Sequence, residues 1–168
     1  MNSIIKALNK CKIIDDYYAT LEGILEHNNN LITQAIFQEH KYTRIRIHQC
    51  NSFELLLICW SPNQSSSYHD HGKSECLMSC ISGELQEITS QKNIEEKTNM
   101  IPNYISHISN KECHKIKNVS ATNAISLHLY IPPITRCNVF NKISSNHPQQ
   151  VKLEPDFFMP KEEAYNEK

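Results

Sequence analysis

The spacing of apolar residues changes once along the chain, close to residue 41. Over residues 15–27, apolar side chains recur at helical spacing after two acidic residues, a pattern typical of a helix and its first turn. Three asparagines at 28–30 interrupt this pattern, and residues 31–40 repeat it. We therefore predict two or three short helices in residues 1–40, packed against the outside of the fold that follows.

From Tyr42 onward the period becomes two, as expected for β-strands. Residues 42–49 alternate polar and apolar side chains, while residues 53–60 form an apolar run that suits a strand buried on both faces and places Trp60 in the core. Further short strands are predicted at 67–71, 76–81, 85–89, 103–108, 114–119, 124–131 and 136–140. Turn-like pieces, among them 82–83 and 91–99, separate these strands. Many short strands with little helix between them predict a mainly β fold, a jelly-roll barrel or sandwich.

The chain shows no internal repeat and no linker, so its 168 residues are expected to form one domain, 1–168. This domain would comprise a helical segment at about 1–40 and a β-barrel at about 41–158. Residues 154–168 are charged towards their end, and we expect this C-terminal end to fray.

Composition and charge exclude several classes of partner. The net charge is −1 at pH 7 and the basic residues are scattered, so neither nucleic acid nor a membrane is expected as a partner. No apolar run approaches the roughly 20 residues that span a bilayer, and the N-terminus lacks the apolar core of a secretory signal. Seven cysteines without a CxxC pair argue against both a disulfide framework and a thiolate zinc site. We expect a monomer with free thiols in the cytoplasm.

His69 and His71 stand two residues apart. Within a strand both imidazoles would project from one face, which neither an apolar core nor a solvated surface requires but which suits a metal ion. A third histidine could come from His107 or His114. Three imidazoles would leave open coordination positions, as in a catalytic site, but imidazole alone does not choose between zinc, copper, nickel and iron.

The spacing resembles the two motifs of the cupin superfamily, carried here by His69, His71, Cys76, Gly83, His114 and Asn118. In that superfamily the HxH pair and an acidic residue come from one hairpin, and a third histidine comes from a later strand. His114 is favoured over His107, because only His114 has an asparagine at the matching place. Cys76 stands where most cupins carry a glutamate, and Glu75 is the alternative.

Beyond these motifs the chain resembles the cysteine dioxygenase family. The matching pieces follow the family's order from Tyr42 to near Phe140: 42–44, 55–60, 69–71 with Cys76, 114–120, 126–133 and Cys137. "SLHLY" followed by two prolines, downstream of the HxH motif, is the most specific of them. The helical segment and the residues after 140 match poorly, and Glu75 replaces a histidine that is usual in animal members.

The resemblance implies an Fe(II) ion held by His69, His71 and His114. It also implies that L-cysteine and O2 are the substrates, that cysteine sulfinic acid is the product, and that the reaction belongs to L-cysteine catabolism and taurine biosynthesis. Arg44 would hold the substrate carboxylate, since a guanidinium offers a bidentate fork, and Tyr42 would join it. Without the resemblance, Arg44 would be interpreted as part of a solvated strand face.

Ser126, His128 and Tyr130 alternate with leucines and therefore share one face of a strand. Turned inward, they would form a hydroxyl–imidazole–phenol row that orients Tyr130 and relays protons; turned outward, they would be a solvated face. The resemblance implies the catalytic role, and also a thioether bond between Cys76 and Tyr130. A cis peptide bond is predicted within residues 131–133.

Two other functions stay open on the sequence alone. A thiol dioxygenase acting on 3-mercaptopropionate or cysteamine would share the metal site, although cysteamine has no carboxylate for Arg44 to hold. A non-catalytic metal-binding cupin would bind the ion without consuming oxygen, and it would leave the co-occurrence of Arg44, Cys76, His128 and Tyr130 unexplained.

Overall fold

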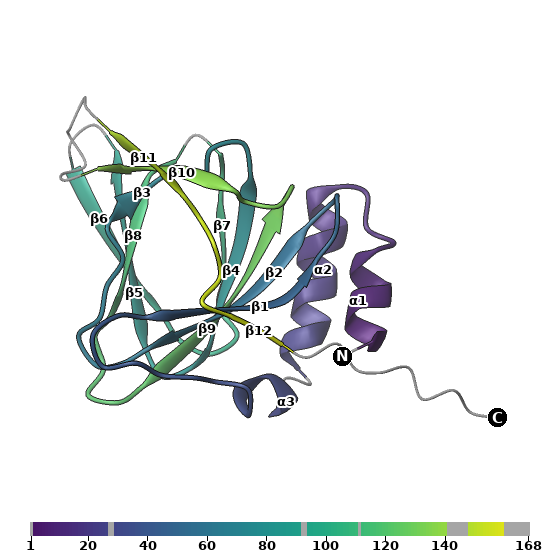
Figure 1. The fold of residues 1–168 in the computed structure, drawn as a ribbon, viewed down its shortest axis with the longest axis horizontal. Coiled ribbons are helices and arrows are strands. Elements are labelled where there is room, and N and C mark those ends of the chain that lie inside the picture. The colour runs from purple at the N-terminus through teal and green to yellow at the C-terminus, as the bar shows by residue number, and fades with distance from the viewer. Residues whose placement is uncertain (1, 27–28, 92–93, 111, 141–147, 160–168) are drawn as a thin grey trace.

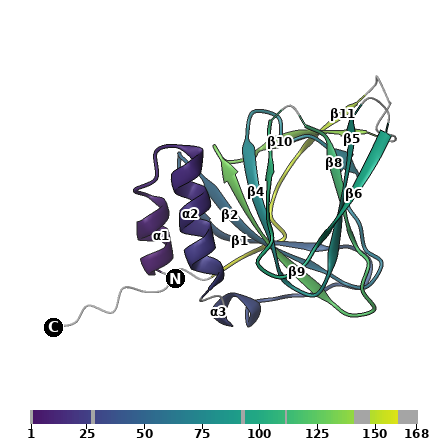
Figure 2. The same ribbon diagram turned by 180° about the vertical axis from the view of Figure 1, so that it is seen from behind.

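The structure, a computed structural model, describes residues 2–26, 29–91, 94–110, 112–140 and 148–159. Two six-stranded β-sheets face each other, and helices α1 (Asn2–Leu8) and α2 (Ile14–Leu25) lie against the outer side of one of them (Figures 1 and 2). The short helix α3 (Asn29–Ile32) precedes the first strand. No helix in the described part of the chain is long and apolar enough to cross a membrane.

Each sheet combines strands from distant parts of the chain. The first sheet has the order β12 (Phe157–Phe158), β1 (Thr43–Gln49), β2 (Glu54–Trp60), β9 (Ala124–Ile131), β4 (Glu75–Ser82) and β7 (Ile105–Ile108). The second has the order β11 (Gln149–Lys152), β10 (Arg136–Phe140), β3 (Tyr68–His69), β8 (His114–Asn118), β5 (Leu85–Gln91) and β6 (Ile94–Met100). Neighbouring strands are antiparallel, except that β12 runs parallel to β1.

Strand β2 shows how the first sheet separates two apolar layers. All of its residues are buried. Leu55 and Leu57 pack in one cluster with residues of the helices, whereas Leu56, Ile58 and Trp60 belong to a second cluster between the two sheets. The two faces of β2 thus contact different layers, which explains why its sequence does not alternate. The interpretation of Trp60 as a core residue is confirmed by its exposure of 1%.

The predicted mainly β jelly roll with N-terminal helices is confirmed, but the helix expected at 31–40 is wrong. Helix α3 ends at Ile32, and the chain then turns and runs without regular structure to β1. Ala35 and Phe37 still pack against the layer beneath the helices. The apolar spacing in this segment therefore reflects the burial of an irregular stretch and not a helix face.

The turn predicted at 91–99 is also wrong. Strand β6 pairs with β5 from Leu85 opposite Met100 to Gln91 opposite Ile94. Residues 95–99 are exposed, because β6 is the last strand of its sheet. Edge strands are commonly protected by charged residues, and such a strand lacks the apolar alternation that would identify it from sequence.

The C-terminal end is more ordered than predicted. Strands β11 and β12 were not expected, and the N–H of Met159 donates to the carbonyl of Arg46 at 2.9 Å. Only part of the segment predicted to fray can be compared, since 160–168 lie outside the described residues.

Candidate metal centre and active site

Three histidines from three parts of the chain meet between the two sheets. His69 on β3 is paired in register with His114 on β8, and His71 follows β3. One ring nitrogen from each of the three lies within 4.8 Å of the others, and the Nε2 atoms of His71 and His114 are 3.1 Å apart. The structure thus brings together the three predicted ligands.

A turn, and not a longer strand, presents His71 beside His69. The strand predicted at 67–71 is shorter, because β3 ends at His69. The carboxylate of Asp70 accepts hydrogen bonds from the N–H of Gly72 at 3.1 Å and from the N–H of Asn138 at 2.8 Å. Gly72 has a φ of +61°, a conformation that favours glycine, and an added Cβ would lie 3.0 Å from a backbone oxygen. This turn fixes the backbone that carries the second imidazole.

The chemistry of the three rings fits a metal ion. Burial, together with the neighbouring His114, lowers the pKa of His69 to about 3, and burial and His114 lower the pKa of His71 well below its usual value. Both rings are therefore neutral at physiological pH and offer lone pairs. Two nitrogens, each about 2.1 Å from a shared ion and at a right angle, would lie about 3.0 Å apart, close to the observed 3.1 Å between His71 and His114.

Glu87 orients His114, the third predicted ligand, and was not itself predicted from the sequence. Its carboxylate accepts a hydrogen bond from Nδ1 of His114 at 2.7 Å and another from the hydroxyl of Ser106 at 2.6 Å. Burial opposes ionisation of Glu87, but the contact with His114 and the bond from Ser106 outweigh it and hold the pKa of this carboxyl below its usual value. Because Nδ1 of His114 is engaged by Glu87, its Nε2, which lies 3.1 Å from Nε2 of His71, is the nitrogen that faces the site.

Replacing Glu87 by glutamine is expected to weaken metal binding by about 10- to 100-fold, because an amide holds the ring of His114 less firmly. The affinity is measured by competition with a chelator. Glu75→Gln is the matched control, since Glu75 contacts no ligand histidine. If Glu87→Gln bound the metal as tightly as Glu75→Gln and the wild type, Glu87 would not support the site.

The structure separates the two alternatives that the sequence left open. His107 lies on the opposite face of the first sheet and pairs with Glu75 at 2.8 Å, both side chains being partly exposed. Cys76 faces the interior and is completely buried. The third histidine near the pair is therefore His114, and the inward residue of the motif is Cys76.

Ser126, His128 and Tyr130 face inward from β9 and are buried. Nε1–H of Trp60 donates to the hydroxyl of Ser126 at 2.9 Å, and this hydroxyl lies 2.8 Å from Nε2 of His128. Nδ1 of His128 is 3.4 Å from the hydroxyl of Tyr130. Since the indole can only donate, Ser126 accepts from Trp60 and keeps its own proton, which it can donate to Nε2 of His128. Burial lowers the pKa of His128 well below its usual value, so this ring is neutral.

Cys76 and Tyr130 are direct neighbours across strands β4 and β9. Their side chains interact, and burial raises the pKa of both groups well above their usual values. Thiol and phenol are therefore protonated side by side. The peptide bond between Ile131 and Pro132, just after this pair, is cis, as predicted.

Two more predicted residues lie at the site: Arg44 on β1, and Tyr42 just before this strand. A cavity of about 130 Å³, the size class that accommodates one small molecule, is lined by Tyr42, Arg44, Trp60, His69, His128 and Tyr130, among others. Nε of Arg44 is buried and has no hydrogen-bond partner within the described residues, and the ring of Tyr42 lies 4.6 Å from that of Trp60. Arg44 is thus partly buried and lines the cavity, whereas Arg46 on the same strand is paired with the buried Glu54 at 2.7 Å.

Residues 4–143 match the family model described as cysteine dioxygenase type I. The chain belongs to this family. Its relatives include cysteine dioxygenase type 1 of Rattus norvegicus, 29% identical over 151 residues that cover 83% of this chain and 75% of that protein. The protein of the same name from Danio rerio is 28% identical over 80% of this chain and 73% of its own. Family membership confirms the resemblance and makes the chain a thiol dioxygenase.

Solved structures support the fold independently. An RmlC-like cupin protein from Desulfovibrio desulfuricans superposes with a TM-score of 0.56, covering 64% of this chain and 97% of that chain at 17% identity. The protein TT1209 from Thermus thermophilus gives the same TM-score of 0.56 at 21% identity, covering 61% of this chain and 94% of that chain. At these identities the likeness shows the cupin fold alone.

Proposed function

We propose that this protein is a cysteine dioxygenase that adds both atoms of O2 to the thiol of L-cysteine and releases cysteine sulfinic acid. The observation that carries the proposal is that Arg44 lines the same cavity as His69, His128 and Tyr130. A cation suited to a carboxylate thus lines the same cavity as His69, whose imidazole lies with those of His71 and His114 in a group suited to a metal that binds a thiolate. Family membership supports the dioxygenase chemistry, and Arg44 supports a thiol that carries a carboxylate.

We propose Fe(II) as the ion, with His69, His71 and His114 as its ligands. Three neutral imidazoles leave the charge of the ion uncompensated, unlike a site of two histidines and one carboxylate, and a substrate thiolate would supply the missing negative charge. When bound, the iron would supply the open coordination positions and the redox chemistry that oxygen activation requires. Overall, RSH and O2 give RSO2H: the sulfur is oxidised, O2 is reduced, and no external reductant is needed.

Arg44 and Tyr42 would bind and orient the substrate. The guanidinium would pair with the carboxylate of L-cysteine through two parallel hydrogen bonds. Burial raises the pKa of Tyr42, so its hydroxyl stays protonated and can donate to the same carboxylate. Fixing the carboxylate fixes the distance from the thiol to the three histidines, which is the main contribution that positioning makes to rate.

Tyr130 would hold a proton close to the reacting sulfur. Its phenol stays neutral because it is buried, and His128 is held by Ser126, which is in turn fixed by Trp60. This arrangement supports a phenol whose hydroxyl direction is set before the substrate arrives, as general acid–base catalysis requires.

We also propose that Cys76 and Tyr130 become joined by a thioether bond. An S–H bond and a ring C–H bond break, a C–S bond forms, and O2 accepts the two electrons and two protons that are released. The cross-linked fraction is therefore expected to rise with turnover, and intact-mass measurement should detect the loss of two hydrogens. Cys76→Ser should keep its full mass. An unchanged wild-type mass after extended turnover would contradict the cross-link.

The proposed function is tested by oxygen uptake of the anaerobically Fe(II)-loaded protein with L-cysteine, 3-mercaptopropionate and cysteamine. Preferential uptake with L-cysteine is expected. Preference for cysteamine would remove the role of Arg44, and preference for 3-mercaptopropionate would keep the carboxylate but change the substrate. Retained iron without uptake on any thiol would indicate a non-catalytic metal-binding cupin.

The proposal also covers the compartment in which the enzyme acts. The seven cysteines are free thiols, which supports a reducing compartment, and we propose the cytoplasm. There the enzyme would act as a monomer in L-cysteine catabolism, at the step that leads towards taurine biosynthesis.

A further inference from the structure

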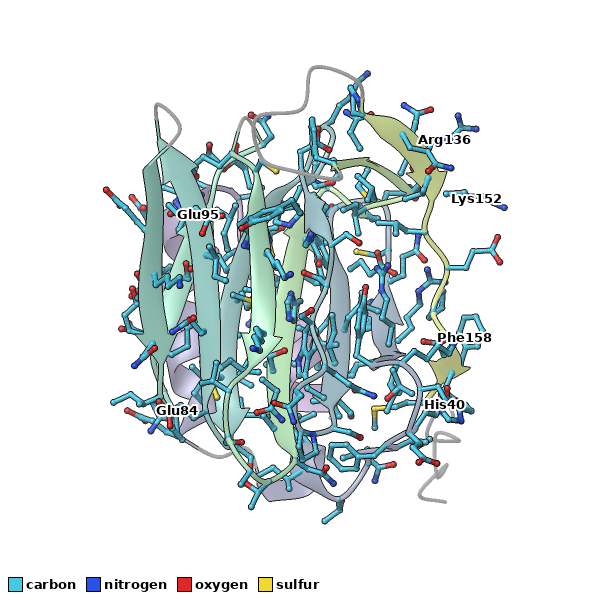
Figure 3. The ribbon with its side chains drawn as sticks, turned by 90° about the vertical axis from the view of Figure 1, so that its left-hand side faces the viewer. His40, Glu84, Glu95, Arg136, Lys152 and Phe158 are labelled. Atoms are coloured by element: carbon cyan, nitrogen blue, oxygen red, sulfur yellow. The ribbon has the colours of Figure 1, made fainter. Side chains whose placement is uncertain are left out.

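The end of the chain crosses from one sheet to the other, beyond the part that matches the family model. The match ends at residue 143, whereas residues 149–158, named here the C-terminal strap, follow it. Strand β11 at its start pairs with β10 of the second sheet, and β12 at its end pairs with β1 of the first. Figure 3 shows the strap along one edge of the molecule, from Lys152 to Phe158. The strap thus links an edge of the second sheet, where β11 is the last strand, to an edge of the first sheet, where β12 is the last strand.

The strap forms one wall of the substrate cavity. Val151 and Leu153 line this cavity together with Arg44 and His69, and both pack against the apolar cluster between the sheets. The N–H of Leu153 donates to the carbonyl of Thr135 at 2.9 Å, which fixes the wall to the chain just before β10. The size of the cavity on this side is therefore set by side chains outside the family match.

The same strap holds the backbone of Arg44 at two points. The N–H of Asp156 donates to the carbonyl of Arg44 at 2.8 Å, and the N–H of Arg44 donates to the Asp156 carboxylate at 2.9 Å. The other carboxylate oxygen pairs with Lys41. Asp156 thus engages both backbone groups of the residue whose side chain enters the cavity.

We propose that the C-terminal strap completes the substrate site, with Asp156 as a positioning residue for Arg44 and Leu153 as the wall that limits substrate length. The inference rests on the proposed function, in which Arg44 binds the substrate carboxylate. The buried Nε of Arg44 has no partner in the described part of the chain, so no acceptor fixes this atom, and the backbone of Arg44 sets where the side chain enters the cavity. A small shift of that backbone therefore moves the guanidinium of Arg44 away from the substrate carboxylate.

The test compares steady-state kinetics of Asp156→Ala, Asp156→Asn and Glu154→Ala in the full-length, iron-loaded protein. Glu154 is the matched control, because it lies on the same strap and pairs with Lys152 at the surface. Asp156→Ala is expected to raise KM for L-cysteine about tenfold, below the roughly 100-fold that a 1 Å misplacement can cost. The value of kcat and the iron content should stay close to wild type. Asp156→Asn should recover most of the loss, because its amide oxygen can accept from Arg44.

Leu153→Ala gives a second readout that does not depend on Asp156. Removing the wall is expected to raise kcat/KM for homocysteine relative to L-cysteine by about tenfold, the lower end of the effect of one methylene on discrimination. If Asp156→Ala loses its fold, this ratio still tests the strap as the wall of the substrate site, and an unchanged ratio overturns the role of Leu153.

The outcomes also distinguish this inference from the proposed function. Wild-type turnover of L-cysteine with identical KM values for Asp156→Ala and Glu154→Ala would overturn the positioning role alone. Equal losses of kcat, iron content and thermal stability in Asp156→Ala, without recovery in Asp156→Asn, would indicate a merely structural tie and would also overturn it. A wild-type protein that oxidises no thiol would overturn the proposed function and, with it, this inference.

Discussion

Replacing His114 by alanine is expected to abolish iron retention and oxygen uptake. His114 is buried, is fixed by Glu87 and supplies one of the three converging nitrogens, so its loss leaves two ligands and an uncompensated buried carboxylate. The affinity should fall by more than the roughly 100-fold that the loss of a supporting residue can cost. Iron content after anaerobic loading and gel filtration measures the effect.

His107→Ala is the matched control for this substitution. His107 pairs with Glu75 on the far face of the first sheet, so its removal should leave iron content and activity at the wild-type level. Loss of iron in His107→Ala together with retention in His114→Ala would contradict the proposed ligand set.

Replacing Arg44 by methionine is expected to lower kcat/KM for L-cysteine by roughly 30- to 5,000-fold. The reason is that a buried carboxylate deprived of its charged partner costs about 2–5 kcal/mol, and about 1.4 kcal/mol corresponds to a factor of ten. Methionine keeps much of the length and apolar contact of the arginine, so the cavity should stay filled and iron content should be unchanged. Steady-state oxygen uptake with L-cysteine measures the loss.

Lysine substitutions at positions 44 and 46 provide the control. Arg44→Lys keeps the charge but loses the bidentate fork, so a clear loss of activity with L-cysteine is expected. Arg46→Lys keeps a cation beside Glu54, outside the substrate cavity, and should have little effect. If Arg44→Lys lowered the activity with L-cysteine as little as Arg46→Lys, Arg44 would act as a general positive charge and not through bidentate binding of the carboxylate.

The His69–His71 pair and the row on β9 could be predicted because each depends on local spacing, whereas His114 was favoured over His107 only through the resemblance to cupins. His69 and His71 are close in sequence, and alternation alone puts Ser126, His128 and Tyr130 on one face. Whether that face of β9 lies in the core depends on the tertiary fold, and the same is true of the side chain of Arg44. Only the resemblance to a known family indicated that these side chains face the interior. The detail that presents His71 was missed, since the turn depends on Asp70 binding a residue of β10.

Glu87 and Asp156 could not be assigned from the sequence, because their partners are set by strand register and by chain crossing. A signal for Glu87 did exist: it is an acid on the same face as the buried Leu85. Asp156 gave no such signal, since the contact joins it to a residue 112 positions earlier. Residues 91–99 were wrongly predicted as a turn for a related reason. Strand β6 is held by its pairing with β5, although its sequence lacks the apolar residues that would identify a strand.

The measurement that tests the central claim most directly is the mass of the product formed from L-cysteine under ¹⁸O2. The account predicts cysteine sulfinic acid that carries two labelled oxygen atoms, with no label entering from ¹⁸O-water in the converse experiment. A product with one labelled atom, or cystine formed while oxygen is consumed, would contradict it, because the site would then oxidise the thiol without transferring both atoms of O2 to sulfur.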